Sequence, residues 1–187
     1  VYIDYPGFNL RICKWAKKKK FKNYFYIAPQ VWAWKEKRSE IIKKYIDQLY
    51  VVLPFDKDYF TTKHNIKANF FGHPLMDDLK KFQLKKIECK RPIISILPGS
   101  RKQEISKILN EILNICKYYP DFKFIIAGVK HVGEETYNKI ITKKNCNVEV
   151  IYGRTYDIIS SSKLSIVTSG TATLETALLN TPQIVCY

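Results

Sequence analysis

The chain has 187 residues, of which 46% are hydrophobic, so it can bury one large core or two small ones, and its composition excludes a disordered chain or a fibrous repeat. Its net charge is +15, with Lys outnumbering Arg by 27 to 5. Lysine-rich compositional drift or attraction to an anionic membrane surface could explain this charge. Nucleic-acid binding is disfavoured, because proteins that bind nucleic acid usually combine bidentate arginines with stacking aromatic side chains. The cysteines, at positions 13, 89, 116, 146 and 186, are odd in number and form no C-x-x-C pair, which argues against a disulfide framework or zinc site, and no apolar run approaches the ~20 residues of a membrane span.

Short apolar runs alternate with amphipathic stretches along the whole chain. The chain opens on Val1-Tyr2-Ile3 and closes on Gln183–Tyr187, which we expect to be core strands, and on that ground we expect a fragment of a longer protein. The other predicted strands are Tyr24–Ala28, Leu49–Leu53, Asn69–Phe71, Ile93–Leu97, Phe122–Ala127, Val148–Ile151 and Leu164–Val167. The predicted helices are Leu10–Lys19, Lys37–Ile46, Lys57–Lys63, Gln103–Tyr118, Glu135–Lys143 and Ala172–Leu179.

This β-α-β alternation predicts α/β domains with parallel, doubly wound sheets. Residues 81–91 are charged, lack an apolar period and are followed by Pro92, so we expect a linker there. Residues 1–80 would then be the second half of one Rossmann-like domain, and residues 92–187 the first part of another, both incomplete.

The turn Ile3-Asp4-Tyr5-Pro6-Gly7-Phe8-Asn9 joins the first predicted strand to a helix. Asp4 at a strand's carboxyl end could be a general base, or it could merely cap the helix, and the sequence leaves both open.

Two further loops of this half follow strands. Pro29-Gln30-Val31-Trp32-Ala33-Trp34 holds two of the three tryptophans and could line a sugar or acyl pocket, with core packing as the alternative. The turn Gly72-His73-Pro74 could contact substrate, although a lone His is more often structural. Leu53-Pro54-Phe55-Asp56 is interpreted as a structural turn.

The second half carries two glycine turns that each run from a strand into a helix. Leu97-Pro98-Gly99-Ser100-Arg101 would aim backbone N–H groups and a bidentate guanidinium at a phosphate, or else be a Ser-capped helix with a surface Arg. In Ser169-Gly170-Thr171-Ala172-Thr173-Leu174-Glu175, small residues would let the backbone approach a ligand closely, and Glu175 could accept hydrogen bonds from ribose hydroxyls. The alternative is a helix N-terminus with a capping acid.

Taken in order, these six motifs resemble the lipid-A-disaccharide synthase family, inverting glycosyltransferases of the GT-B architecture. The resemblance spans nearly the whole chain. One departure is Gly7, where many members carry a second acid, which leaves Asp4 as the sole acid of its turn.

The resemblance implies transfer of diacylglucosamine from UDP-2,3-diacylglucosamine to the 6-hydroxyl of 2,3-diacylglucosamine 1-phosphate, with no metal or cofactor, in the cytoplasm at the anionic inner-membrane surface. On it we expect Asp4 and Arg101 to be catalytic. The UDP-sugar would be bound by Gly99, Ser100, Arg101, Ser169, Gly170, Thr171 and Glu175. The acceptor side would be formed by Asn9, Gln30, Trp32, Trp34 and His73. The alternatives are another UDP-sugar enzyme of this fold, such as a UDP-N-acetylglucosamine epimerase or the peptidoglycan N-acetylglucosaminyltransferase, and a basic nucleic-acid-binding module.

Overall fold

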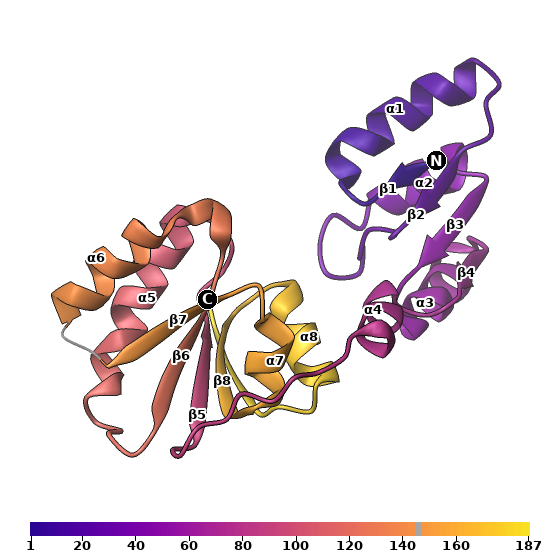
Figure 1. The fold of residues 1–187 in the computed structure, drawn as a ribbon. Coiled ribbons are helices and arrows are strands. Elements are labelled where there is room, and N and C mark those ends of the chain that lie inside the picture. Colours follow the sequence, from indigo (N-terminus) through magenta and orange to yellow (C-terminus); the bar gives the residue numbers. More distant parts are fainter. Residues whose placement is uncertain (145–146) are drawn as a thin grey trace. The chain divides into compact units, whose positions relative to one another are not determined.

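The computed structural model describes residues 1–144 and 147–187, so Cys146 lies outside the described residues. The chain divides into two compact units, Val1–Lys81 and Phe82–Tyr187. Each is an α/β unit built on a wholly parallel sheet with helices packed against it, as the alternation of the sequence predicted (Figure 1). Cys13, Cys89 and Cys186 are free thiols.

The first unit contains a four-stranded sheet in the order β1-β2-β3-β4. Its strands are β1 (Tyr2–Ile3), β2 (Tyr24–Tyr26), β3 (Gln48–Val51) and β4 (Ala68–Phe70), and its helices are α1 (Pro6–Lys18), α2 (Arg38–Tyr45), α3 (Pro54–His64) and α4 (Pro74–Lys81). Because the strands are parallel, the turns that follow them lie at one edge of the sheet.

The core of the first unit forms because the apolar residues of α1 recur at helical spacing. Leu10, Cys13 and Ala16 share one face and are buried. The buried amide of Asn23 then ties three elements together. Its Nδ2 donates to the carbonyl oxygens of Cys13 (2.9 Å) and Tyr45 (2.7 Å), while its Oδ1 accepts from the Tyr2 hydroxyl (3.0 Å).

The second unit contains a five-stranded sheet in the order β7-β6-β5-β8-β9. Its strands are β5 (Ile93–Leu97), β6 (Lys123–Gly128), β7 (Val148–Tyr152), β8 (Ser162–Thr168) and β9 (Gln183–Cys186). Its helices are α5 (Lys102–Cys116), the 3-10 turn η1 (Lys130–Val132), α6 (Glu134–Lys144), α7 (Thr155–Ser160) and α8 (Thr171–Leu178). The winding reverses direction between β5 and β8, which makes their shared carboxyl end a topological switch point.

Both faces of this second sheet are buried near β5. On one face Ile94 and Ile96 join the apolar side of α5, where Ile105 and Leu109 are fully buried. On the other face Ile93 and Leu97 belong to a cluster that includes Ile158 and Ile159 of α7. A strand with both faces covered is largely apolar, which makes Ile93–Leu97 recognisable from sequence. Its one polar side chain, the buried Ser95, is hydrogen-bonded to the Ser165 hydroxyl (2.6 Å).

The segment expected to be a linker is attached to the second unit. Residues 82–91 form no helix or strand, yet the backbone N–H of Lys85 donates to Asp157 Oδ1 (2.8 Å) and that of Ile87 to Ser161 Oγ (2.9 Å). Burial raises the pKa of Asp157, but the bonds from Lys85 and from Arg154 Nε (2.9 Å) outweigh it and leave the pKa lowered.

Both end segments form strands, as predicted. Within this chain each is the outermost strand of its sheet, and Ile3 and Ile184 are 61% and 54% exposed. Helices α4 and α7 were not predicted from the sequence. Each is eight residues long or shorter, too short for a clear helical period.

Candidate functional site

The carboxyl ends of β5 and β8 open into a cavity of about 450 Å³ in the second unit. Both glycine turns singled out in the sequence meet there, together with residues from the ends of β6 and α7. The lining comprises Leu97, Gly99, Ser100, Arg101, Glu104, Ala127, Val129, Thr155, Thr168, Ser169, Gly170, Thr171, Ala172 and Glu175. Ligands of doubly wound sheets bind at such a switch point, because the two loops part there.

The first turn requires glycine at position 99. Gly99 has a φ of +100°, and a Cβ on it would lie 3.1 Å from Oε2 of Glu104. Oε1 of Glu104 accepts a 2.8 Å hydrogen bond from Nη1 of Arg101, whose side chain is 81% exposed. The alternative of a Ser-capped helix is wrong, since Arg101 is the N-cap residue of α5 and no side chain caps the helix.

The second turn opens α8. Gly170 is its N-cap residue, at φ +156° and ψ −162°, a conformation essentially confined to glycine. No side chain caps this helix either, and Ser169 is tied to β9 by its backbone N–H, which donates to the carbonyl of Cys186 (2.9 Å). The first N–H groups of α5 and α8 have no partner within their helices, so both helix ends can bind an anion.

Thr168 adds an independent sign that a polar ligand fits this cavity. Its Oγ1 is buried, and within residues 1–144 and 147–187 it has no hydrogen-bond partner. Buried hydroxyl groups are normally paired, because an unpaired one costs about 1–3 kcal/mol.

Glu175 is positioned by a residue that the sequence analysis missed. The Tyr156 hydroxyl donates to Glu175 Oε1 at 3.1 Å, and the Phe82 ring packs edge-on against Tyr156 at 5.1 Å between centroids. Phe82, Gly153, Thr155, Tyr156 and Glu175 line a side cavity of about 330 Å³ that shares Thr155 and Glu175 with the main one. The available signal was Gly153 after a predicted strand, the same pattern as the other two turns.

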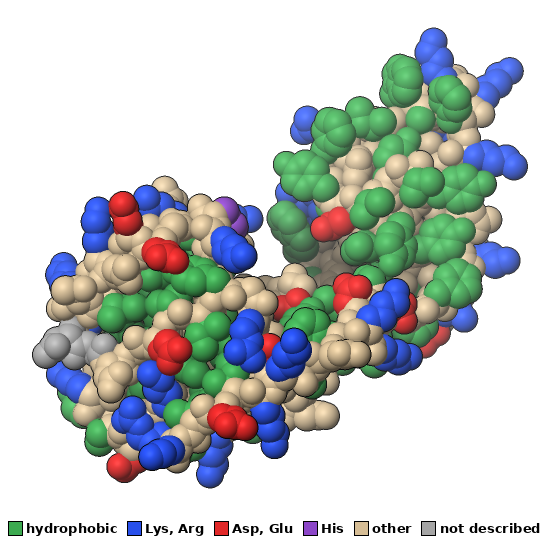
Figure 2. Space-filling model, in the orientation of Figure 1, with side chains coloured by type: hydrophobic (Ala, Val, Ile, Leu, Met, Phe, Trp, Pro, Cys, Tyr) green, Lys and Arg blue, Asp and Glu red, His purple; other side chains and the backbone are tan. Residues whose placement is uncertain are grey.

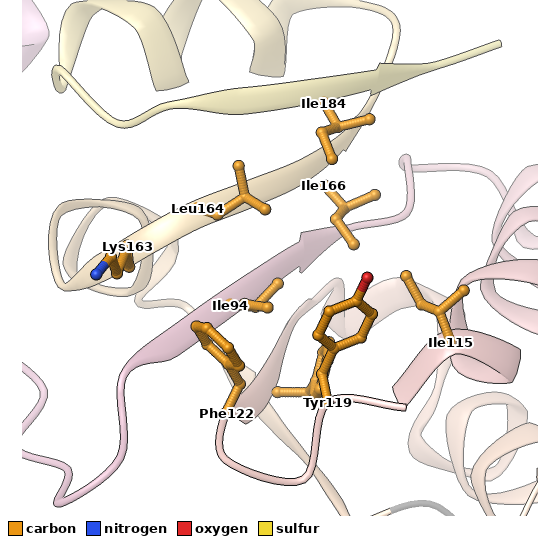
Figure 3. Close-up of a pocket in the computed structure, with 9 residues that line it drawn as sticks. Ile94, Ile115, Tyr119, Phe122, Lys163, Leu164, Ile166 and Ile184 are labelled. Carbon is orange, nitrogen blue, oxygen red and sulfur yellow. The ribbon is translucent and has the colours of Figure 1, made fainter. Parts of the chain in front are cut away.

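Another cavity of the second unit, about 380 Å³, has a different character (Figure 3). Ile94, Ile166 and Ile184 of three adjacent strands line its floor, and Tyr119 and Phe122 from the α5–β6 connection line its side. Among the residues that the structure describes, Lys163 supplies the one charged side chain in its lining. This cavity lies over a face of the sheet and lacks the helix ends that the β5–β8 site offers.

In the first unit, Asp4 stands in a strained turn at the end of β1. Asp4 and Tyr5 have φ values of 44° and 42°, and the Asp4 backbone N–H donates to the Tyr26 carbonyl (3.0 Å). The N-cap residue of α1 is Tyr5, and no side chain caps the helix, so Asp4 does not serve as a cap. Asn9 stabilises the turn instead, because its Nδ2 donates to the carbonyl oxygens of Ile3 (3.1 Å) and Asp4 (2.7 Å).

The tryptophan loop is only partly available to a ligand. Trp32 Nε1 donates to the buried carboxylate of Asp56 (2.7 Å), and the Trp32 ring packs edge-on against Phe55. Burial raises the pKa of Asp56, and the bond from Trp32 opposes that rise. Trp34 is 61% exposed and lies under the Nζ of Lys35 at 4.2 Å, while Gln30 is exposed.

His73 lines a cavity of about 350 Å³ at the ends of β2, β3 and β4. Its Nδ1 accepts from the backbone N–H of Leu75 (3.2 Å), at the start of α4. Tyr26, Tyr50, Asp77 and Asp78, none of which the sequence analysis proposed, share the lining. Asp4, Asn9, Gln30, Trp32 and Trp34 do not.

Metal and membrane signals were also sought in the described part of the chain. No group of three or more His, Cys, Asp or Glu residues gathers there in a way that could hold a metal ion. No helix there has the length and apolar character needed to cross a bilayer.

Comparison with known proteins gives matches over the whole chain. The family model described as "Lipid-A-disaccharide synthetase" matches residues 1–187. "Lipid-A-disaccharide synthase 1" of Legionella pneumophila (strain Lens) is 35% identical over 199 residues, covering 100% of this chain and 52% of that protein. The chain therefore spans about half the length of the curated relatives it matches.

Solved structures agree on the fold. A putative UDP-N-acetylglucosamine 2-epimerase from Listeria monocytogenes has a TM-score of 0.64 at 12% identity, covering 94% of this chain and 53% of that one. A structure titled "S. aureus MnaA-UDP co-structure" has a TM-score of 0.65 at 12% identity, covering 92% of this chain and 53% of that one. At such identities the likeness shows the fold alone, the paired Rossmann-like units of the GT-B class.

Proposed function

Because the chain belongs to the lipid-A-disaccharide synthetase family, we propose that the whole protein transfers diacylglucosamine from UDP-2,3-diacylglucosamine to the 6-hydroxyl of 2,3-diacylglucosamine 1-phosphate. The products are a β-1,6-linked disaccharide 1-phosphate and UDP. The observation that carries the proposal is the β5–β8 cavity, where two helix N-termini, Arg101 and Glu175 converge.

The donor fits this cavity chemically. The diphosphate would accept hydrogen bonds from the N–H groups of the Gly99–Arg101 and Ser169–Thr171 turns, where helix dipoles favour negative charge. The Arg101 guanidinium is exposed enough to exchange Glu104 for phosphate oxygens, which it can bind with two parallel bonds. Glu175, held by Tyr156, would accept from the ribose hydroxyls. A UDP complex of the same fold is consistent with a nucleotide diphosphate as ligand.

The reaction itself is a single displacement at the anomeric carbon. The acceptor O6–H proton passes to a base, the O6–C1 bond forms, and the C1–O bond to the β-phosphate breaks with its electron pair leaving on UDP. Attack from the face opposite the leaving group inverts the anomeric centre. Arg101 and the two helix ends would stabilise the charge that develops on the diphosphate, and one such donor is typically worth about 10²–10³ in rate.

Asp4 is the proposed base. It follows β1 at the carboxyl end of the strands of the first sheet, where Gln30 and His73 also follow strands. Asp4 is exposed, and its carboxylate does not cap α1. Asn9 would act through the turn, because it holds the Asp4 backbone in place. The acceptor side is proposed to be lined by Gln30, Trp32, Trp34 and His73. Trp32 and His73 would contribute their ring faces, because Trp32 Nε1 and His73 Nδ1 are already hydrogen-bonded within the first unit.

We place the reaction in the cytoplasm at the inner membrane. Both proposed substrates carry two acyl chains, which partition into a bilayer at about 0.8 kcal/mol per buried CH₂. The net charge of +15 suits an anionic lipid surface.

The deciding experiment uses the full-length protein with UDP-diacylglucosamine and diacylglucosamine 1-phosphate. Mass spectrometry should detect a disaccharide 1-phosphate together with UDP, and proton NMR should show a β linkage. Conversion of UDP-N-acetylglucosamine to its 2-epimer without disaccharide would identify an epimerase instead. Transfer of N-acetylglucosamine to a peptidoglycan precursor would identify the other alternative.

A further inference from the structure

Helix α1 carries a second apolar row that has no place in the core. Phe8, Ile12 and Trp15 stand four and then three residues apart, and so share one side of the helix. They are 56%, 37% and 57% exposed. Phe21, in the turn that follows, is 59% exposed, and its ring centroid lies 6.5 Å from that of Trp15.

This row is distinct from the face of α1 that packs on the sheet. Leu10, Cys13 and Ala16 provide that face and are buried. Within residues 1–144 and 147–187, the outer row therefore exposes large side chains that pack on no part of the core. Tyr5 continues the row beyond Phe8, with 6.5 Å between the two ring centroids. Contiguous exposed apolar surface of this kind commonly marks a binding surface.

Positive charge lies beside the row and beyond its end. Arg11, Lys14 and Lys18 are exposed along one side of it, and Lys19, Lys20 and Lys22 surround Phe21. No acidic residue occurs between Asp4 and Glu36 in the sequence. Two lysines of α1 have partners within the first unit: Lys17 Nζ pairs with Asp47, and Lys14 Nζ lies 5.9 Å from the centroid of the Tyr45 ring. Figure 2 shows hydrophobic side chains gathered over the first unit, with Lys and Arg around the margin.

We propose that this surface, formed by Phe8, Ile12, Trp15, Phe21 and the surrounding lysines, docks the protein on an anionic phospholipid bilayer. Tryptophan and phenylalanine insert at the depth of the lipid headgroups, while long lysine side chains reach back to the phosphates. Nucleic acid fits less well, because Phe8 and Ile12 offer no hydrogen bonds to it and the surface has one arginine. The proposal rests on the proposed membrane location and adds the surface responsible for it.

Docking here has a functional consequence within the first unit. The row begins at Tyr5, directly after Asp4, so the end of α1 that meets the bilayer lies beside the proposed base. An acceptor whose acyl chains remain in the bilayer could then present its 6-hydroxyl to Asp4 without leaving the membrane surface.

The test is sedimentation of the full-length protein with vesicles, in the absence of any sugar substrate. Vesicles of phosphatidylcholine mixed with phosphatidylglycerol are compared with vesicles of phosphatidylcholine alone. One variant combines Trp15→Ser with Phe21→Ser. A second combines Lys18→Gln, Lys19→Gln and Lys20→Gln. Tyr118→Ser, at a 68% exposed site of the second unit, and Lys90→Gln with Lys107→Gln and Lys139→Gln are the matched controls.

We expect the wild-type protein and both controls to partition onto the anionic vesicles. The aromatic variant should lose about tenfold or more in partitioning, as expected from two interfacial anchors. The lysine variant should lose on the order of 100-fold, at about fivefold for each basic residue near the surface. Both variants should keep wild-type activity on substrates dispersed in detergent micelles.

Equal binding to both vesicle types, or wild-type partitioning of the lysine variant, would overturn the proposal. Capture by RNA with no partitioning onto vesicles would identify nucleic acid as the partner and overturn it too. If the aromatic variant melts at a lower temperature than the wild type, the lysine variant decides. Because no substrate is present, an inactive protein that still binds anionic vesicles contradicts the proposed reaction and leaves the docking surface supported.

Discussion

The hydroxyl of Tyr156 donates a 3.1 Å hydrogen bond to Oε1 of Glu175, and this bond joins α7 to α8 beside the β5–β8 cavity. It fixes one oxygen of a carboxylate that lines the cavity, so the side chain is held in place to meet a ligand. Tyr156→Phe should therefore weaken UDP binding by about 3- to 10-fold, the net worth of one typical hydrogen bond. Isothermal titration with UDP checks this, with Tyr118→Phe as the exposed control. Unchanged affinity would show that Glu175 needs no support from Tyr156.

Arg101→Ala should abolish turnover and leave the melting temperature close to that of the wild type. The guanidinium is 81% exposed and its one ion pair, to Glu104, lies at the surface, so little stability depends on it. Arg101→Lys should restore little activity, because an ammonium cannot bind two phosphate oxygens side by side. Lys102→Ala, at the next exposed position, is the control. Wild-type turnover in Arg101→Ala would remove Arg101 from the mechanism.

Glu175→Ala should raise the Michaelis constant for the donor more than it lowers turnover. In the proposed function its carboxylate holds ribose, away from the bond that breaks, so its loss resembles a loss of uniform binding. Combined with Tyr156→Phe, it should show no further loss of affinity, since the tyrosine acts through the carboxylate. A fall of about two to three orders of magnitude in turnover at saturating donor would instead indicate a role in the chemical step.

Asp4→Asn should cut turnover by roughly 10²–10⁴, the range for loss of a general base. Stability should hardly change, because Asp4 does not cap α1 and asparagine tolerates its positive φ of 44°. UDP affinity should be retained, because the proposed donor cavity belongs to the second unit. Wild-type turnover in Asp4→Asn would remove Asp4 from the mechanism.

Asp56→Asn should stabilise the first unit at neutral pH. Burial raises the pKa of Asp56 in the folded state above its unfolded value. The protonated acid therefore contributes stability that is complete below the unfolded pKa and is lost as pH rises through the folded pKa. The amide oxygen of Asn can still accept from Trp32 Nε1 without a buried charge. Melting curves from about pH 4 to about pH 8 should show the gain growing with pH. A variant less stable than the wild type at every pH would contradict this.

The local elements were largely predictable because their cause is local. Gln103–Tyr118 was expected to be a helix from its apolar period, and α5 spans Lys102–Cys116 with Ile105 and Leu109 fully buried. Ile93–Leu97 was expected to be a strand and is one. The short helices α4 and α7 escaped prediction because eight residues or fewer are too few to show a clear helical period.

The sequence by itself determined the parallel α/β character, the family, and the two glycine turns that each end a strand and begin a helix. Spacing of apolar residues reports which side of an element is buried, and a positive-φ turn needs glycine wherever it occurs. Only the tertiary structure decided that β5 and β8 are neighbours, although 64 residues separate Leu97 from Ser162 at the bounds of the two strands. That pairing brings Arg101, Thr168 and Glu175 to one cavity and adds Tyr156 and Phe82 beside it. It also left Phe8, Ile12 and Trp15 outside the core. Strand order and exposure depend on contacts between distant segments, and no local pattern of residues encodes such contacts.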